Sequence, residues 1–132
     1  MKYLLLSYTP ITEWNSAEPE SPSPEALEAF AVYQKFQEEL MASGELVATE
    51  GLGHPSMSRT LRKEAGSVVV SDGPFAELKE VLASYAVIEC SGYDRAVEIA
   101  RQVVAAVGDT VEIRPIMGEE FEAPPIPNTA ST

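Results

Sequence analysis

The sequence contains few of the residues that mark a disulfide-bonded or catalytic protein. Its 132 residues include one cysteine, Cys90, one histidine, His54, and one tryptophan, Trp14. A single cysteine excludes a disulfide within the chain. The sequence has neither a Gly-x-Ser-x-Gly motif nor a glycine-rich phosphate-binding loop, so it gives no indication of a serine hydrolase or a nucleotide-binding protein. We therefore expect no bound cofactor.

Long apolar segments and basic residues are also scarce. The apolar runs are short and interrupted by charges, and a membrane-spanning helix needs roughly 18 to 20 apolar residues. Nine Lys and Arg stand against 21 Asp and Glu, and the net charge of −12 opposes direct binding to nucleic acid. The first residues, MKYLLLSYTP, lack a small-residue cleavage site and are more typical of a strand than of a signal peptide. We expect a cytoplasmic protein that binds neither nucleic acid nor membranes.

The residues that are present predict one domain of the α+β class. The hydrophobic fraction of 45% is typical of a globular protein with its own core. Apolar residues at intervals of three and four predict two amphipathic helices, 24–43 and 92–108, each ended by a glycine. Ser23 is a favourable N-cap for the first helix. The predicted strands are 2–8, 45–51, 84–90 and 110–117, and a hairpin joins 57–64 to 67–71 through a turn at Ala65 and Gly66.

Without the hairpin, this order of elements is that of the ferredoxin-like fold. The βαββαβ chain forms a four-stranded antiparallel sheet with both helices on one face. We assign residues 1–118 to this domain and 119–132, which are acidic and rich in proline, to a flexible tail. The residues expected to pack on the sheet are Ala26, Ala29, Phe30, Tyr33, Phe36 and Leu40 in the first helix, and Ala96, Val97, Ala100, Val103, Val104 and Val107 in the second.

The other face of such a sheet is left uncovered by the helices. Side chains alternate between the two faces of a strand, so Ala86 and Ile88 are expected to face the helices and Tyr85 the open side. Faces that mix polar and apolar residues are common in dimer interfaces and in small-molecule clefts. We therefore expect a homodimer. The residues predicted on the open face are Tyr85, Val87, Glu89, Glu112, Arg114 and Ile116.

Residues 71–80, SDGPFAELKE, form the most specific motif of the chain. The block DGPFAELKE, preceded by SVVVS and followed by SYAVIE, resembles the signature of the DGPF-type branch of the YCII-related proteins. LVATEGLGHP upstream and TVEIRPIM downstream are also similar to that family. The resemblance covers about residues 1–118. It implies a dimeric α+β barrel of the ferredoxin-like type, with a cleft between the open sheet face, the helix ends and the DGPF loop.

The resemblance implies a group of small bacterial proteins without one shared activity. Some YCII-related members resemble enzymes that act on small aromatic or chlorinated rings, and some DGPF-type members accompany alternative sigma factors. The family's proposed catalytic pair is a His early in the first helix and an Asp near its end. Phe30 and Ala42 stand at those places here, and Leu78 replaces the usual Thr of the motif. These differences argue against a mechanism built on that pair.

Asp72 and His54 are the candidate catalytic residues. Asp72, in a glycine turn beside Phe75, could act as a general base, but Asp-Gly is also common turn chemistry and Asp72 could cap a short helix beginning near Pro74. His54 could titrate near neutral pH and act as a base. A histidine before a proline in a turn is, equally, typical of an exposed loop. Glu77 could share a proton or a cation with Asp72, but two oxygen ligands without a supporting histidine predict no metal site.

The remaining candidates are aromatic or cationic. Tyr85, Trp14 and Tyr8 could form a wall for a planar ligand, or could contribute to dimer contacts. Arg114 either pairs with a neighbouring carboxylate or binds an anionic ligand. The charged run 77–80 is typical of an exposed helical turn. Cys90 is expected to face the core, where a thiol is inert.

Two functions remain open from the sequence. The first is a homodimeric YCII-related protein that binds a small organic molecule, an aromatic one included, with lyase- or isomerase-like acid–base chemistry. The second is a non-catalytic regulatory protein whose partner is a sigma factor or another protein. A ligand-sized cavity lined by Asp72, Tyr85 and Arg114 would favour the first function. A flat face with only symmetry-related contacts would favour the second.

Overall fold

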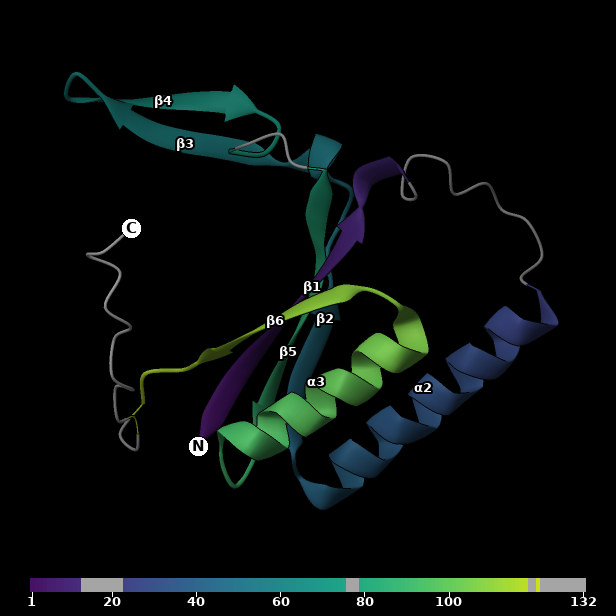
Figure 1. Cartoon of the computed structure of the whole chain (residues 1–132). Helices are drawn as coiled ribbons and strands as arrows, with labels where there is room; N and C mark the ends of the chain where they lie inside the picture. The colour runs from purple at the N-terminus through teal and green to yellow at the C-terminus, as the bar shows by residue number, and fades with distance from the viewer. Residues whose placement is uncertain (13–22, 76–78, 119–120, 122–132) are drawn as a thin grey trace, which may run out of the picture.

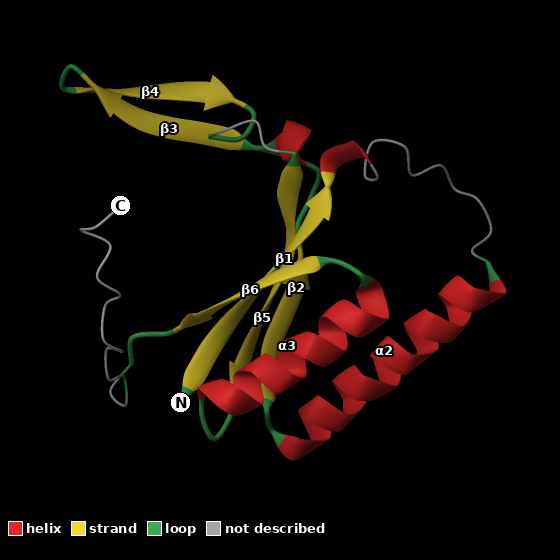
Figure 2. Ribbon diagram, viewed as in Figure 1, coloured by secondary structure: helices red, strands yellow, loops and turns green. Residues whose placement is uncertain are grey.

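The described residues form one four-stranded sheet, a separate two-stranded hairpin and two long helices. The computed structural model describes residues 1–12, 23–75, 79–118 and 121. The four-stranded sheet is antiparallel with the order β2–β5–β1–β6, and helices α2 and α3 lie together on one of its faces (Figures 1 and 2). This topology confirms the ferredoxin-like α+β prediction. The elements are β1 (Lys2–Pro10), α2 (Pro24–Ser43), β2 (Leu46–Gly51), the 3-10 helix η1 (Pro55–Met57), β3 (Arg59–Glu64), β4 (Ser67–Asp72), β5 (Glu80–Glu89), α3 (Tyr93–Val107) and β6 (Thr110–Pro115).

Helix α2 begins and ends where the sequence predicts. The Ser23 hydroxyl accepts a hydrogen bond from the backbone N–H of Ala26 at 3.1 Å, and Gly44 ends the helix with φ 82°. Its packing departs from the prediction, because Leu40 is buried but Phe30 and Ala26 are exposed. The first turns of the helix extend away from the sheet (Figure 1), so the apolar stripe there has nothing to pack against. No described helix, this one included, is long and apolar enough to cross a membrane.

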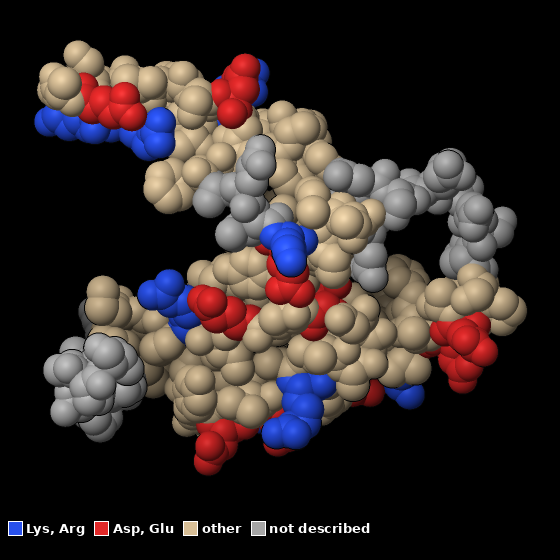
Figure 3. Space-filling model, turned by 45° about the horizontal axis from the view of Figure 1, so that its top comes forward, with Lys and Arg blue, Asp and Glu red and all other residues tan. Residues whose placement is uncertain are grey.

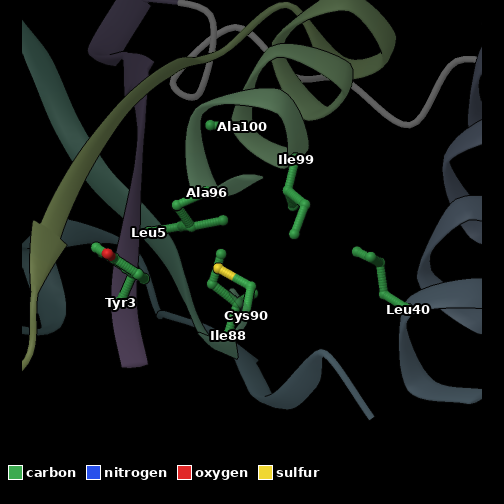
Figure 4. Close-up of a cluster of buried hydrophobic side chains, with 8 residues drawn as sticks. All are labelled: Tyr3, Leu5, Leu40, Ile88, Cys90, Ala96, Ile99 and Ala100. Carbon is green, nitrogen blue, oxygen red and sulfur yellow. The ribbon is translucent and has the colours of Figure 1, made fainter. Parts of the chain in front are cut away.

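The core lies between the sheet and the helices. Ile88 of β5 and Ile99 of α3 are both fully buried. The predicted stripe of α3 missed Ile99, and it wrongly included Val104, at the flank of the buried arc, and Val107, the last residue of the helix. Burial of these apolar side chains is the main force that holds the helices on the sheet. The buried cluster comprises Tyr3, Leu5, Leu40, Ile88, Cys90, Ala96, Ile99 and Ala100 (Figure 4).

Strand β5 is longer than predicted and contains a bulge. It begins at Glu80, so this residue belongs to a strand and the prediction of a helical turn is wrong at this position. The register jumps where Tyr8 pairs with Leu82, which leaves Ala83 as an extra residue on β5. Alternation therefore shifts by one residue, and Leu82 and Glu80 come to lie on the face of the sheet that Tyr8 occupies.

Strands β3 and β4 form the predicted hairpin. Ala65 and Gly66 make its two-residue turn with φ 49° and 83°, the positive values that a tight hairpin turn of this kind requires. The hairpin leaves one end of the sheet and stands apart from α2 and α3 (Figure 1). Every residue of its strands is exposed except the half-buried Thr60.

Candidate functional site at the open face of the sheet

The face of the sheet opposite the helices combines an apolar centre with charged residues. Tyr3 and Leu5 of β1 are buried beneath the helices, so the alternate residues Leu4 and Leu6 point to the open face. Residues paired directly across antiparallel strands share a face, which confirms the side predicted for the residues of β5 and β6. The open face is formed by Leu4, Leu6 and Tyr8 of β1, Tyr85, Val87 and Glu89 of β5, and Glu112 and Arg114 of β6.

A cavity of about 610 Å³ lies where this face meets the hairpin and the DGPF segment. Tyr8 and Leu82 line it from the sheet, His54 from the segment before η1, and Pro74 and Phe75 from the motif. Most of its wall is apolar, with a few polar side chains among the apolar ones. A small organic ligand needs a concave site of this size and composition.

A second cavity adjoins the first along the same face. Its volume is about 920 Å³, and both cavities are lined by Tyr8 and Glu80. Lys79 and Glu112 add opposite charges to its wall, so it is the more polar of the two. Glu80 accepts a hydrogen bond from the Thr110 hydroxyl at 3.3 Å, which ties the start of β5 to β6. Tyr8 and Glu80 therefore stand between two concave surfaces.

His54 is half-buried and its ring is held by the next turn of the chain. Its Nδ1 accepts a hydrogen bond from the backbone N–H of Ser56 at 3.1 Å and lies 2.9 Å from the Ser56 hydroxyl. A nitrogen that accepts from a backbone N–H carries no proton, so the proton of the neutral ring is on Nε2. In this tautomer, the ring presents a hydrogen-bond donor at Nε2. The side chain is part of a cavity wall, which sets it apart from an exposed loop histidine.

Asp72 lies at the end of β4 and at the base of the hairpin. Its carboxylate pairs with the Arg59 guanidinium at 3.2 Å, and its side chain is 88% exposed. The described residues that follow, Gly73–Phe75, are not helical, so Asp72 caps no helix within them. The structure places Asp72 in a cross-strand ion pair rather than among the residues that line the two cavities described above.

The corner at Gly73 is fixed by hydrogen bonds to β3 and its approach. The Gly73 N–H donates to the Ser58 carbonyl at 2.9 Å, and its own carbonyl accepts from the Thr60 hydroxyl at 2.8 Å. Its φ of 92° is a conformation that L side chains rarely adopt, which explains the glycine of the motif. This corner sets the position of Phe75 at the cavity.

The structure thus brings some of the predicted site residues together and separates others. His54 and Phe75 line one cavity, whereas Tyr85 and Arg114 lie on the open face and Asp72 at the hairpin base. The predicted ligand residues Trp14 and Glu77 lie outside the described residues, as does most of the predicted tail 119–132.

Two cavity residues, Leu82 and Glu80, escaped the sequence interpretation. Both reach the open face only because Ala83 forms the bulge, and simple alternation along β5 would place them on the helix side. The segment EVLASY carries no glycine or proline that would mark a bulge. Tyr8 was recognised as a possible aromatic wall residue, but alternation alone did not reveal that two cavities share it.

Cys90 belongs to the core and lines neither of the two cavities. The Cys90 thiol is free and buried in the core. Among the described residues, no three His, Cys, Asp or Glu side chains are grouped so that they could hold a metal ion. The cavities therefore offer hydrogen bonding, charge and apolar contact.

Comparison with known proteins gives two matches that span most of the chain. A family model described as the YCII-related domain matches residues 1–122. An uncharacterized protein of Rhizobium meliloti (strain 1021) is 32% identical over 118 residues, which cover 88% of this chain and 92% of that protein. The family match includes the hairpin, the DGPF segment and all the strands that form the cavities.

Proposed function

Since this chain belongs to the YCII-related family, we propose that it is a homodimer that binds a small organic molecule in the cavity beneath the hairpin. The observation that carries the proposal is the cavity of about 610 Å³ on the open face of the sheet. Its walls combine apolar side chains such as Leu82 and Phe75 with a few polar ones, Tyr8 and His54 among them. Ligand sites in proteins are mostly apolar with a small number of placed polar groups.

The wall chemistry favours a ligand with a flat apolar body and an oxygen acceptor. Phe75 offers a ring for stacking and Leu82 an aliphatic surface. The Tyr8 hydroxyl is a donor that would pair with a carbonyl or carboxylate oxygen, and the His54 ring adds a polar side chain to the same wall. Aromatic acids and ketones of modest size are therefore the first class to test.

A catalytic form of the proposal is acid–base chemistry of the lyase or isomerase type. The groups that would exchange protons with the ligand are His54 and a carboxylate. Glu80 lines the cavity and is better placed for this than Asp72, whose side chain pairs with Arg59. Asp72 remains in the proposal as the alternative base.

The homodimer follows from the open face of the sheet. Leu4, Leu6 and Val87 lie at its centre without a covering helix, and a second copy would remove them from water. Tyr85 and Arg114 would then contact either the partner or an extended ligand. A sedimentation mass that stays near the monomer value of 14.3 kDa at micromolar concentration would contradict the dimer.

We also place the protein in the cytoplasm, since its single cysteine is a free thiol.

A thermal-shift screen tests the ligand site. The wild type and two variants are heated with a panel of small aromatic and carboxylic compounds. Leu82→Trp fills the cavity, whereas the matched control Val107→Trp adds the same side chain at the exposed end of α3. A ligand of the native state raises the melting temperature by mass action. We expect the ligand to raise the melting temperature of the wild type and of the control, but not that of Leu82→Trp. An equal rise in all three proteins would contradict this site.

The alternative is a non-catalytic protein that binds a sigma factor or another protein. The observation that favours it is the exposed apolar surface of the hairpin, because such patches mark protein–protein contacts. A monomeric mass at every concentration, together with no ligand-induced shift, would favour this alternative over the first function.

A further inference from the structure

The β3–β4 hairpin has no interior of its own. Its strands contact chiefly each other, and no described residue adds a further strand to either of its long edges. A lone two-stranded sheet is at best marginally stable in water, and unpaired edges invite another chain to bind. The hairpin therefore needs a contact beyond itself to hold it in place.

One face of the hairpin carries three apolar side chains beside three charged ones. Leu61 pairs with Val70, Lys63 with Val68, and Arg59 with Asp72 at the base of the hairpin, so these six residues share a face. Leu61, Val68 and Val70 are 62%, 67% and 58% exposed. We call this surface the apolar hairpin face. The opposite face carries Thr60, Arg62, Glu64, Ser67, Val69 and Ser71 and is mostly polar.

The charge of the hairpin is opposite to that of the rest of the chain. Residues 59–72 contain three of the nine basic residues, Arg59, Arg62 and Lys63, against two acids, Glu64 and Asp72. Their net charge is +1, which leaves −13 for all the other residues of the chain. Figure 3 shows basic side chains along the hairpin together with acidic ones, and side chains of both signs on the body of the molecule. The hairpin, with its net charge of +1, is thus electrostatically suited to pack on the acidic body of a second copy.

The hairpin is positioned so that it can contact a protein bound to the open face of the sheet. The helices occupy one side of the sheet, and the hairpin projects from the end of the sheet away from them (Figures 1 and 2). Glu50, Glu89 and Glu112 belong to the strands of that sheet and are exposed. A copy seated on the open face would present such carboxylates to Lys63 on the apolar hairpin face.

We propose that the hairpin is an arm that packs its apolar face, Leu61, Val68 and Val70, on a second copy of this chain, with Lys63 paired to carboxylates of the partner. The arm rests on the proposed homodimer and deepens it. Because the first cavity lies at the hairpin base, the partner held by the arm also closes the mouth of that cavity, beside the exposed Phe75.

Two neighbouring substitutions in β4 test the arm. Val70→Glu places an acid on the apolar hairpin face, and the matched control Val69→Glu places the same acid on the opposite face. The dimer Kd is measured by sedimentation equilibrium of the full chain. We expect Val70→Glu to raise Kd at least about tenfold and Val69→Glu to change it less than about threefold.

The outcomes separate the arm from the dimer. A wild-type dimer with the same Kd in both variants overturns the arm and leaves the homodimer standing. A wild type that is monomeric at all concentrations overturns both. If Val70→Glu fails to fold, the test becomes zero-length cross-linking of lysines to carboxylates in a mixture of ¹⁴N- and ¹⁵N-labelled wild type. Lys35 of α2, which lies outside the arm, is the control lysine. Mixed-isotope peptides that join Lys63 to strand carboxylates support the arm, and links confined to one isotope overturn it.

Discussion

The four-stranded sheet and the β3–β4 hairpin are both antiparallel, yet they differ in what covers them. In the sheet, one face is closed by α2 and α3, and Ile88 and Ile99 are fully buried there. In the hairpin, every described side chain is exposed except the half-buried Thr60. The strands of both are paired by backbone hydrogen bonds, so hydrogen bonds alone do not account for the difference in stability. The body is held together within one chain, whereas the hairpin depends on its surroundings.

The largest expected loss of stability comes from a substitution between the four-stranded sheet and the helices that cover it. Ile99→Ala removes most of a fully buried side chain between α3 and the sheet, which costs the transfer energy and leaves a cavity. We expect the free energy of unfolding to fall by about 2–5 kcal/mol. Urea denaturation followed by circular dichroism measures it. The control Val107→Ala, at an exposed position of the same helix, should change it by less than about 0.5 kcal/mol, and equal losses in the two variants would contradict the packing described.

The next largest loss of stability is expected from breaking the ion pair that joins α3 to the residue before β2. Nε and Nη2 of Arg95 donate to the two oxygens of the Glu45 carboxylate at 2.8 and 2.9 Å, and both side chains are less than one third exposed. Bidentate, partly buried pairs are stronger than surface pairs. Arg95→Met is expected to lower the free energy of unfolding by about 1–2 kcal/mol. Arg101→Met, on the exposed side of α3, is the control and should leave it nearly unchanged.

The same pair predicts a pH dependence. The hydrogen bonds from Arg95 hold the pKa of Glu45 below its ordinary value of 4.5. A carboxylate whose pKa is lower in the folded than in the unfolded state stabilises the fold above its unfolded pKa, and this contribution is lost as the pH falls through the folded pKa. The difference in unfolding free energy between wild type and Glu45→Gln should be constant near neutral pH and shrink below about pH 4.5. A difference that stays constant down to the acid limit of folding would contradict the pairing.

The smallest change in the free energy of global unfolding is expected from a substitution in the β3–β4 hairpin. Gly66→Ala adds a Cβ in open space but at φ 83°, which strains the hairpin turn by about 1 kcal/mol. If the hairpin is not part of the cooperative core, global unfolding changes little while the amides of residues 59–72 exchange faster. Hydrogen exchange read by mass spectrometry checks this. Gly51→Ala, a β2 glycine without a positive φ, serves as the control.

Features set by local sequence were predictable. The caps at Ser23 and Gly44, the limits of α2, and the Ala65–Gly66 turn depend on a few neighbouring residues, and all of them agree with the structure. The order of strands followed from the hydrophobic pattern because one sheet face must be buried under two helices. The family motif led to the same fold.

Features set by long-range packing were not predictable. Phe30 has the spacing of a core residue, but the sheet does not reach it. The bulge at Ala83 depends on the pairing of β1 with β5, and without it Leu82 and Glu80 could not be placed in the cavities. His54 and Phe75 were identified as candidates separately, and only the fold shows that they line one cavity.

The central claim is that the body is self-sufficient and the hairpin is ordered by a second copy. Hydrogen exchange of the wild type at protein concentrations about tenfold above and below the dimer Kd tests it most directly. We predict that the amides of β1 are protected at both concentrations, whereas those of β3 and β4 become protected only at the higher one. Hairpin amides that exchange at the same rate at both concentrations, while the mass changes from monomer to dimer, would contradict the account.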